Sequence, residues 1–157
     1  IGKKVALLQN DFGFIEGGDV VSNNKITFIG YGNRTSKNTI KNLQKKFNFF
    51  PVKLKNNTLH LDCTLNLIEN YAIVYKKGID FKSKKILKKF FKIIPINREE
   101  FQNLNTNFIV LDKTIFIGNC SDRLCQIFTK LGYKVTNLDM SEFIKLGGSV
   151  RCITQEI

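Results

Sequence analysis

The residues best suited to chemistry lie far apart in the chain. Cys152 ends the segment Gly-Gly-Ser-Val-Arg-Cys at positions 147–152, and a cysteine thiolate is a strong nucleophile. His60, the only histidine, lies two residues before Asp62. Imidazole carries protons near neutral pH, and a nearby carboxylate can orient it. A nucleophile and a proton carrier therefore exist, provided that the fold brings them together.

A second glycine pair lies near the N-terminus, in the segment Glu16-Gly17-Gly18-Asp19. Consecutive glycines permit positive φ angles and close approach of the backbone to other groups. Such a turn could fix the two flanking carboxylates and so hold a cationic ligand. The same residues also fit a hairpin turn with solvated acids, because Gly-Gly turns are common.

The histidine and the cysteine also have structural interpretations. A lone histidine can be a structural or surface residue, and a buried cysteine usually acts as an inert small apolar side chain. If 60–62 is a strand, His60 and Asp62 share one face, which favours a tuned imidazole. If Cys152 also lies on a strand, Arg151 points to the opposite face and is not expected to stabilise its thiolate.

Three similar units would position these residues. Each unit has the pattern strand, strand, helix, strand, with β-branched and apolar runs around an amphipathic helix. Ser36, Ser83 and Ser121 are expected to cap the helices, and Gly132 to end the third one. Such a repeat indicates units that bury their apolar faces against neighbours. We therefore expect one α/β domain over 1–157. The strands are expected at 19–21, 26–30, 50–54, 63–68, 71–75, 93–96, 108–111, 115–118 and 133–135.

In combination, these motifs resemble the guanidino-group-modifying (pentein) superfamily of arginine deiminases, dimethylarginine dimethylaminohydrolases, agmatine deiminases and amidinotransferases. The resemblance covers nearly the whole chain. It rests on Glu-Gly-Gly-Asp at 16–19, Gly-x-x-x-Arg-Thr at 30–35, His-Leu-Asp at 60–62 and Gly-Gly-Ser-x-Arg-Cys at 147–152. The repeated units are similar to that family's modules, five of which form a β/α propeller.

The resemblance implies that this chain is the C-terminal portion of a pentein-type catalytic domain, with about three of the five modules. The first residue, Ile1, is not a Met, as expected of a fragment or a processed product. A family segment similar to Phe-x-Arg-Asp, which supplies a further substrate-binding Asp, has no match here. An open set of modules would leave an exposed sheet edge, so we expect either a missing N-terminal segment or a homo-oligomer.

The resemblance also gives each candidate residue a role. Cys152 matches the family's nucleophile, and His60 matches its general acid/base. Glu16 matches the acidic residue that holds the guanidinium and assists proton transfer. Asp62 matches a second carboxylate that binds the guanidinium. Arg34 matches an arginine that binds the substrate's α-carboxylate, a task that suits a bidentate guanidinium.

The reaction implied by the resemblance starts with thiolate attack on the guanidinium carbon. It proceeds through a covalent thiouronium intermediate and requires no metal or organic cofactor. Asp19 is expected to be structural. If water accepts the amidino group, the protein is a hydrolase of arginine or a methylated arginine; if an amine accepts it, the protein is an amidinotransferase. We expect the hydrolase, because the motifs resemble that branch more closely.

The net charge of +12 leaves a non-enzymatic alternative open. Lys-rich helices around 41–46 and 82–89 could contact nucleic acid, either in a basic binding module or in a catalytically inactive remnant of the fold. Only four of the 25 basic residues are Arg, the better reader of phosphates and bases, so nucleic acid is not the expected partner. The expected partner is a small guanidino compound.

The cysteine pattern and the hydropathy suggest a cytoplasmic protein. The four cysteines have no paired spacing, and there is a single His, so neither a disulfide framework nor a zinc site is expected. No apolar run reaches the ~18 residues of a membrane span. The N-terminal residues also lack the pattern of a signal peptide.

Overall fold

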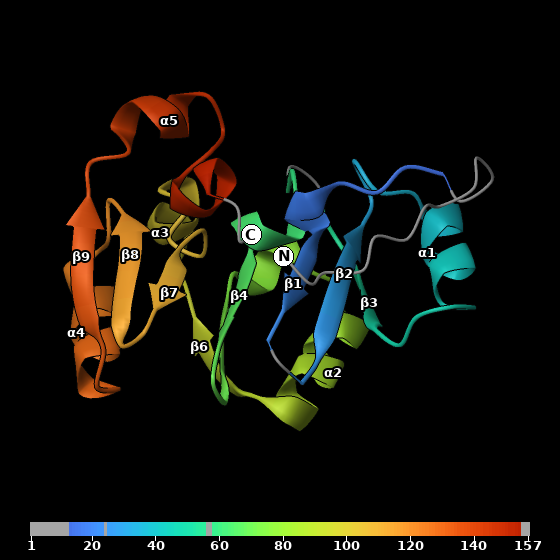
Figure 1. The fold of residues 1–157 in the computed structure, drawn as a ribbon, viewed down its shortest axis with the longest axis horizontal. Helices are drawn as coiled ribbons and strands as arrows, with labels where there is room; N and C mark the ends of the chain where they lie inside the picture. Colours follow the sequence, from blue (N-terminus) through green and yellow to red (C-terminus); the bar gives the residue numbers. More distant parts are fainter. Residues whose placement is uncertain (1–12, 24, 56–57, 155–157) are drawn as a thin grey trace, which may run out of the picture.

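Three small sheets follow one another along the chain (Figure 1). The structure is a computed structural model that describes residues 13–23, 25–55 and 58–154. The N-terminal residues discussed above as a signal peptide lie outside these ranges. Within the described part of the chain, no helix combines the length and apolar character needed to cross a bilayer.

Each sheet belongs to one module of two strands, a helix and a third strand. The first module comprises β1 (Val20–Ser22), β2 (Thr27–Tyr31), α1 (Lys37–Leu43) and β3 (Phe50–Lys53). The second comprises β4 (Leu65–Ile68), β5 (Tyr71–Val74), α2 (Phe81–Phe90) and β6 (Lys92–Pro95). The third comprises β7 (Ile109–Leu111), β8 (Thr114–Gly118), α4 (Asp122–Lys130) and β9 (Lys134–Leu138). The predicted strand-strand-helix-strand repeat is therefore confirmed.

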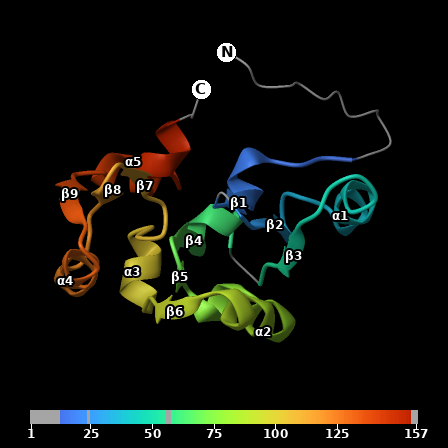
Figure 2. The same cartoon turned by 60° about the horizontal axis from the view of Figure 1, so that its bottom comes forward.

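The three modules share one topology. In each, the first two strands form an antiparallel hairpin, and the third strand returns parallel to the second after the helix. In the first sheet, Ile29 lies opposite Val20 on one side and Pro51 on the other. Helices α1, α2 and α4 lie on the outer side of the array (Figure 2). The face of each sheet that is turned away from its helix packs against the neighbouring module.

Two of the three predicted helix caps are confirmed. Ser36 and Ser121 each accept a backbone N–H from three residues ahead. The prediction for Ser83 is wrong, because α2 begins earlier, and Asp80 caps it by accepting the Ser83 N–H at 2.8 Å. Asp is as good a cap as Ser, and Asp80 starts the helix three residues before the predicted cap. Gly132 has a φ of +84°, which fits its predicted place at the end of α4.

The two segments considered above as strands, 60–62 and the one that carries Cys152, instead form short 3₁₀ turns, Leu61–Cys63 and Val150–Ile153. Their N–H groups bond within or next to the turn: Thr64 donates to Leu61 O at 2.9 Å, and Cys152 donates to Ser149 O at 3.0 Å. The alternation of side chains along a strand does not apply in such turns. The helices α3 (Arg98–Gln102) and α5 (Ser141–Lys145) were not predicted, since one helical turn is too short to give a periodic pattern.

The hydrophobic core lies between modules. One cluster joins the first and second modules, and another joins the second and third. The first cluster contains Val21, Phe28, Val52, Leu54, Leu61, Leu65, Leu67, Ala72, Val74, Ile79, Leu87 and Phe91. The second contains Ile68, Ile73, Ile96, Phe108, Ile115, Ile117, Cys120, Leu124, Phe128 and Tyr133. Each module therefore depends on its neighbour for much of its apolar burial.

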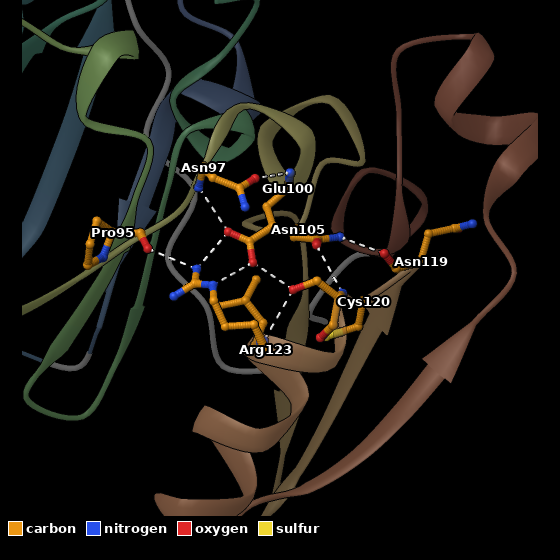
Figure 3. Close-up of polar contacts among 9 residues, drawn as sticks. Pro95, Asn97, Glu100, Asn105, Asn119, Cys120 and Arg123 are labelled. Atoms are coloured by element: carbon orange, nitrogen blue, oxygen red, sulfur yellow. Dashed lines mark hydrogen bonds and ion pairs between the residues drawn. The ribbon is translucent and has the colours of Figure 1, made fainter.

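The buried carboxylate of Glu100 stabilises the junction between the second and third modules (Figure 3). Glu100 on α3 is 1% exposed and accepts hydrogen bonds from Arg123 Nε at 2.9 Å and from Arg123 Nη2 at 2.6 Å. It also accepts Ser121 Oγ at 2.6 Å and completes a capping box with Asn97. The same side chain thus closes the start of α3 and holds the start of α4.

We expect Glu100→Ala to lower the free energy of unfolding by about 2–3 kcal/mol, because several charge-assisted hydrogen bonds are lost at once. The matched control is Glu99→Ala, on the same turn but exposed, which should change it by less than about 0.5 kcal/mol. Urea denaturation measures both. Equal effects of the two substitutions would contradict the structural role of Glu100.

The Glu100 contribution should also depend on pH. Burial alone raises the pKa of this carboxyl, but the hydrogen bonds from Arg123, Ser121 and Asn97 outweigh burial, so the pKa is lowered in the folded state. A group with a lowered folded pKa stabilises above its unfolded pKa of about 4.3 and loses this effect as the pH falls. The difference in stability between wild type and Glu100→Ala should therefore shrink on acidification below about pH 4.

Candidate active site

One open pocket of about 630 Å³ collects residues from all three modules. It lies where the turn before β1, the turn before β4 and the final 3₁₀ turn meet. Its lining consists of Gly17, Gly18, His60, Asp62, Ile109, Arg151, Cys152 and Thr154. The two glycine-rich segments and the histidine segment, which are distant in sequence, therefore border the same cavity.

Glu16 links His60 to Arg34. His60 Nε2 lies 2.6 Å from Glu16 Oε2, and Arg34 Nε donates to Glu16 Oε1 at 2.8 Å. The hydrogen bonds from Arg34 and then from His60 lower the pKa of the Glu16 carboxyl. An ionised Glu16 can orient the imidazole through this hydrogen bond. The carboxylate that holds the imidazole is thus Glu16 rather than the expected Asp62.

The Gly-Gly turn lets the imidazole approach the backbone. A Cβ atom on Gly18 would lie 2.8 Å from His60 Cγ and Nδ1, which is closer than real contacts allow. Neither glycine of this pair has a positive φ, so close approach, not conformational freedom, explains Gly18. Asp19 is fully buried and accepts the Leu61 N–H at 3.0 Å, which ties this turn to the one that carries His60.

Asp62 is buried beside the cavity. It is 3% exposed, and burial raises the pKa of its carboxyl. The Cys63 thiol donates to Asp62 Oδ1 at 3.5 Å, and burial raises the pKa of that thiol far above its ordinary value. Potential ligand atoms of His60, Asp62 and Cys63 lie within 4.8 Å of one another. Burial and the neighbouring Asp62 raise the pKa of the Cys63 thiol and so favour its protonated form.

Cys152 is exposed and lies within the last 3₁₀ turn. Gly147, with a φ of +84°, turns the chain after α5 and leads into this segment. Because the segment is a turn, Arg151 and Cys152 both border the pocket. The expectation that Arg151 points away from the cysteine is therefore wrong, since it assumed strand alternation.

The structure brings three predicted site residues, His60, Asp62 and Cys152, to one pocket, with Glu16 directly behind His60. Arg34 reaches the group through Glu16 and is half-exposed. Sequence reasoning did not find Ile109, Thr154 and Asn107 at the site. Asn107, which accepts the Cys152 N–H at 3.2 Å, lies in a polar Asn-Leu-Asn-Thr-Asn run before an apolar strand. A run of polar residues directly before an apolar strand could have indicated buried polar side chains with a specific role.

Comparison with known sequences gives a consistent set of relatives. The family described as N,N dimethylarginine dimethylhydrolase, eukaryotic, matches residues 3–157. YkgA of Bacillus subtilis (strain 168) is 35% identical over 148 residues, which cover 91% of this chain and 52% of that protein. The bifunctional arginine dihydrolase/ornithine cyclodeaminase AgrE of Nostoc is 26% identical over 165 residues, covering 99% of this chain and 24% of AgrE. The chain thus spans about half, or less, of these relatives.

Solved structures share the fold. The N-terminal domain of the cyanobacterial arginine dihydrolase ArgZ, bound to product, superposes with a TM-score of 0.88 at 23% identity, covering 98% of this chain and 60% of that one. DDAH from Pseudomonas aeruginosa, complexed with citrulline, gives a TM-score of 0.70 at 25% identity, covering 84% and 51%. The pentein fold and about three of its modules are therefore confirmed.

The four cysteines should differ sharply in reactivity. Burial raises the pKa of Cys63 and Cys120 far above the ordinary thiol value, whereas Cys152 is exposed. We expect iodoacetamide at pH 7 to alkylate Cys152 at least about tenfold faster than Cys63 or Cys120. Peptide mass spectrometry over time measures each site, and Cys125, which is partly buried, serves as an internal reference. Uniform labelling of Cys63 and Cys152 would contradict the described burial.

Proposed function

This chain belongs to the N,N-dimethylarginine dimethylhydrolase family, and we propose that the protein hydrolyses the guanidino group of arginine or a methylated arginine. Because the chain spans about half the length of the curated YkgA, the proposal concerns the full-length protein. The observation that carries it is the pocket at which Cys152, His60 and Asp62 meet, with Glu16 bonded to His60.

The pocket suits a planar cation. Asp62 lines it, and the adjacent Glu16 is ionised under ordinary conditions because its pKa is lowered by Arg34 and His60. A guanidinium offers paired N–H groups that match carboxylates. Burial raises the pKa of Asp62, and an incoming guanidinium would shift that carboxyl back toward its charged form. The positive charge of the bound substrate would thus be balanced by an ionised Asp62.

In the first half-reaction, the Cys152 thiolate attacks the central guanidinium carbon. A C–S bond forms, and the C–N bond to the leaving amine breaks after that nitrogen takes a proton from His60. The intermediate is a thiouronium linked to Cys152. Glu16, hydrogen-bonded to His60 Nε2, orients the imidazole for this transfer.

In the second half-reaction, water replaces the amine. His60, now neutral, takes a proton from the water as its oxygen attacks the thiouronium carbon, and the C–S bond breaks to release the thiolate. The net change is guanidine plus water to a urea group plus ammonia or a methylated amine. No metal or organic cofactor enters this balance.

The test is to incubate the full-length protein with arginine, dimethylarginine or agmatine and to measure citrulline or carbamoylated product and released amine. We expect release with at least one substrate, and Cys152→Ala should lower kcat by at least about a thousandfold. Cys125→Ala, outside the pocket lining, is the matched control and should retain activity.

The outcomes separate the alternatives. Turnover by Cys152→Ala would remove the cysteine mechanism. Transfer to an added primary amine without hydrolysis would indicate an amidinotransferase. A salt-dependent gel shift with nucleic acid, and no turnover of any guanidine, would favour the basic binding module.

Arg34 can be tested separately. If Arg34 binds the α-carboxylate of the substrate, Arg34→Ala should weaken arginine binding about tenfold or more, the value of a charge-assisted hydrogen bond. Agmatine lacks that carboxylate, so its competitive binding should change far less. Equal weakening for both ligands would mean that Arg34 acts through Glu16, to which it donates at 2.8 Å.

A further inference from the structure

A buried polar loop joins the two halves of the candidate active site. Residues 103–107 form most of the connection between α3 and β7, and Asn105, Thr106 and Asn107 are all fully buried. Three consecutive buried polar side chains are costly unless their hydrogen bonds are satisfied. The partners of this loop therefore indicate what it is for.

Thr106 holds the half that carries Asp62. Its Oγ1 donates to Asp62 O at 3.0 Å, across 44 residues of sequence. Its own carbonyl accepts Asn66 Nδ2 at 2.7 Å, so the loop backbone is fixed to the second module as well. The Thr106 hydrogen bond thus fixes the segment of His60 and Asp62 to the loop.

Asn107 holds the half that carries Cys152. Its side-chain Oδ1 accepts the Cys152 N–H at 3.2 Å, and its backbone carbonyl accepts the Arg151 N–H at 3.4 Å. Asn107 Nδ2 is buried and has no hydrogen-bond partner among the described residues. An unpaired buried donor is unfavourable. The carboxamide of Asn107 therefore acts through its oxygen, which accepts the Cys152 N–H.

We propose that Asn107 is a positioning residue: its carboxamide sets the turn of Cys152 and so the direction of the thiol relative to His60 and Asp62. Cys152 is exposed, so packing alone does not immobilise its side chain. The Cys152 N–H, which also donates to Ser149 O at 3.0 Å, is the group through which the Asn107 side chain reaches this turn. The backbone bond from Arg151 N–H to Asn107 O is the second link between the turn and the loop that also anchors Asp62. A small change in the position of the nucleophile can cost about a hundredfold in rate. The proposal rests on the proposed function only for what the thiol attacks.

Asn105 provides the matched control. It is equally buried and lies on the same loop, but its Nδ2 donates to Gly118 O at 2.9 Å and to Asn119 O at 3.1 Å, at the end of β8. Figure 3 shows the bond to Asn119. Replacing Asn105 removes buried hydrogen bonds from the loop without touching the Cys152 turn. Any general loosening of the loop should therefore be visible in both variants, and a positioning effect in only one.

The experiment compares Asn107→Ala, Asn107→Asp and Asn105→Ala in the full-length protein. Three quantities are measured: kcat and KM for the best guanidino substrate, the thermal midpoint, and the pH profile of Cys152 alkylation by iodoacetamide. Asn107→Ala should lower kcat about tenfold or more with KM within about twofold and change the alkylation rate of Cys152. Asn105→Ala should lower the thermal midpoint but leave kcat and the alkylation profile near wild type.

Asn107→Asp is close in shape and keeps an oxygen that can accept the Cys152 N–H. It should retain more activity than Asn107→Ala. Its added negative charge should move the alkylation profile to higher pH by about half a unit or more, because a nearby anion disfavours the thiolate. This variant also keeps the test decisive if Asn107→Ala does not fold.

Two results would overturn the proposal. One is an unchanged kcat and alkylation profile in both Asn107 variants. The other is an equal loss in Asn105→Ala and Asn107→Ala, which would make the loop merely structural. If wild type turns over no guanidine but the Asn107 variants still alter Cys152 alkylation selectively, the proposed function fails while the positioning role stands.

Discussion

Each three-stranded module is too small to bury its own apolar surface, and this constraint governs the whole structure. A three-stranded sheet covered by one helix has a second face that nothing inside the module covers. The two large core clusters answer this need, because each combines side chains of adjacent modules. The apolar burial that stabilises each module therefore also holds the modules together.

The junctions also explain where chemistry is possible. Strands and helices occupy the apolar interfaces, so polar groups collect in the turns at the ends of the strands, where backbone groups must be satisfied in any case. Asp19 accepts a backbone N–H from Leu61, and Thr106 donates to the Asp62 carbonyl. These bonds cross between segments about 40 residues apart. The pocket thus lies among turns that these long-range hydrogen bonds hold together where the modules pack.

The repeated strand-strand-helix-strand order could be predicted from the sequence, because hydrophobic periodicity and Ser caps are local signals. Ser36 and Ser121 cap as predicted, whereas Ser83 does not, because Asp80 offers an equally good cap one turn earlier. The motif order also led to Glu16, His60, Asp62 and Cys152. The pairing of Glu16 with His60 was not predictable from spacing: it depends on the Gly18 approach, and on a 3₁₀ turn that resembles a strand in sequence.

The loop of residues 103–107 limits how such a chain can vary in length. Leu104 has a φ of +51°, an uncommon conformation for a residue with a side chain. Two and three residues later, Thr106 bonds to Asp62 and Asn107 bonds to Cys152. An insertion here would move both turns at once, so neither could follow the other. The exposed hairpin tip Glu69–Asn70 also binds other modules, because Glu69 accepts Asn23 Nδ2 at 3.4 Å and Lys113 Nζ at 2.6 Å, but these bonds do not involve the turns of Asp62 and Cys152. Length changes in related chains should therefore spare this loop, because it sets the spacing between the turns of Asp62 and Cys152.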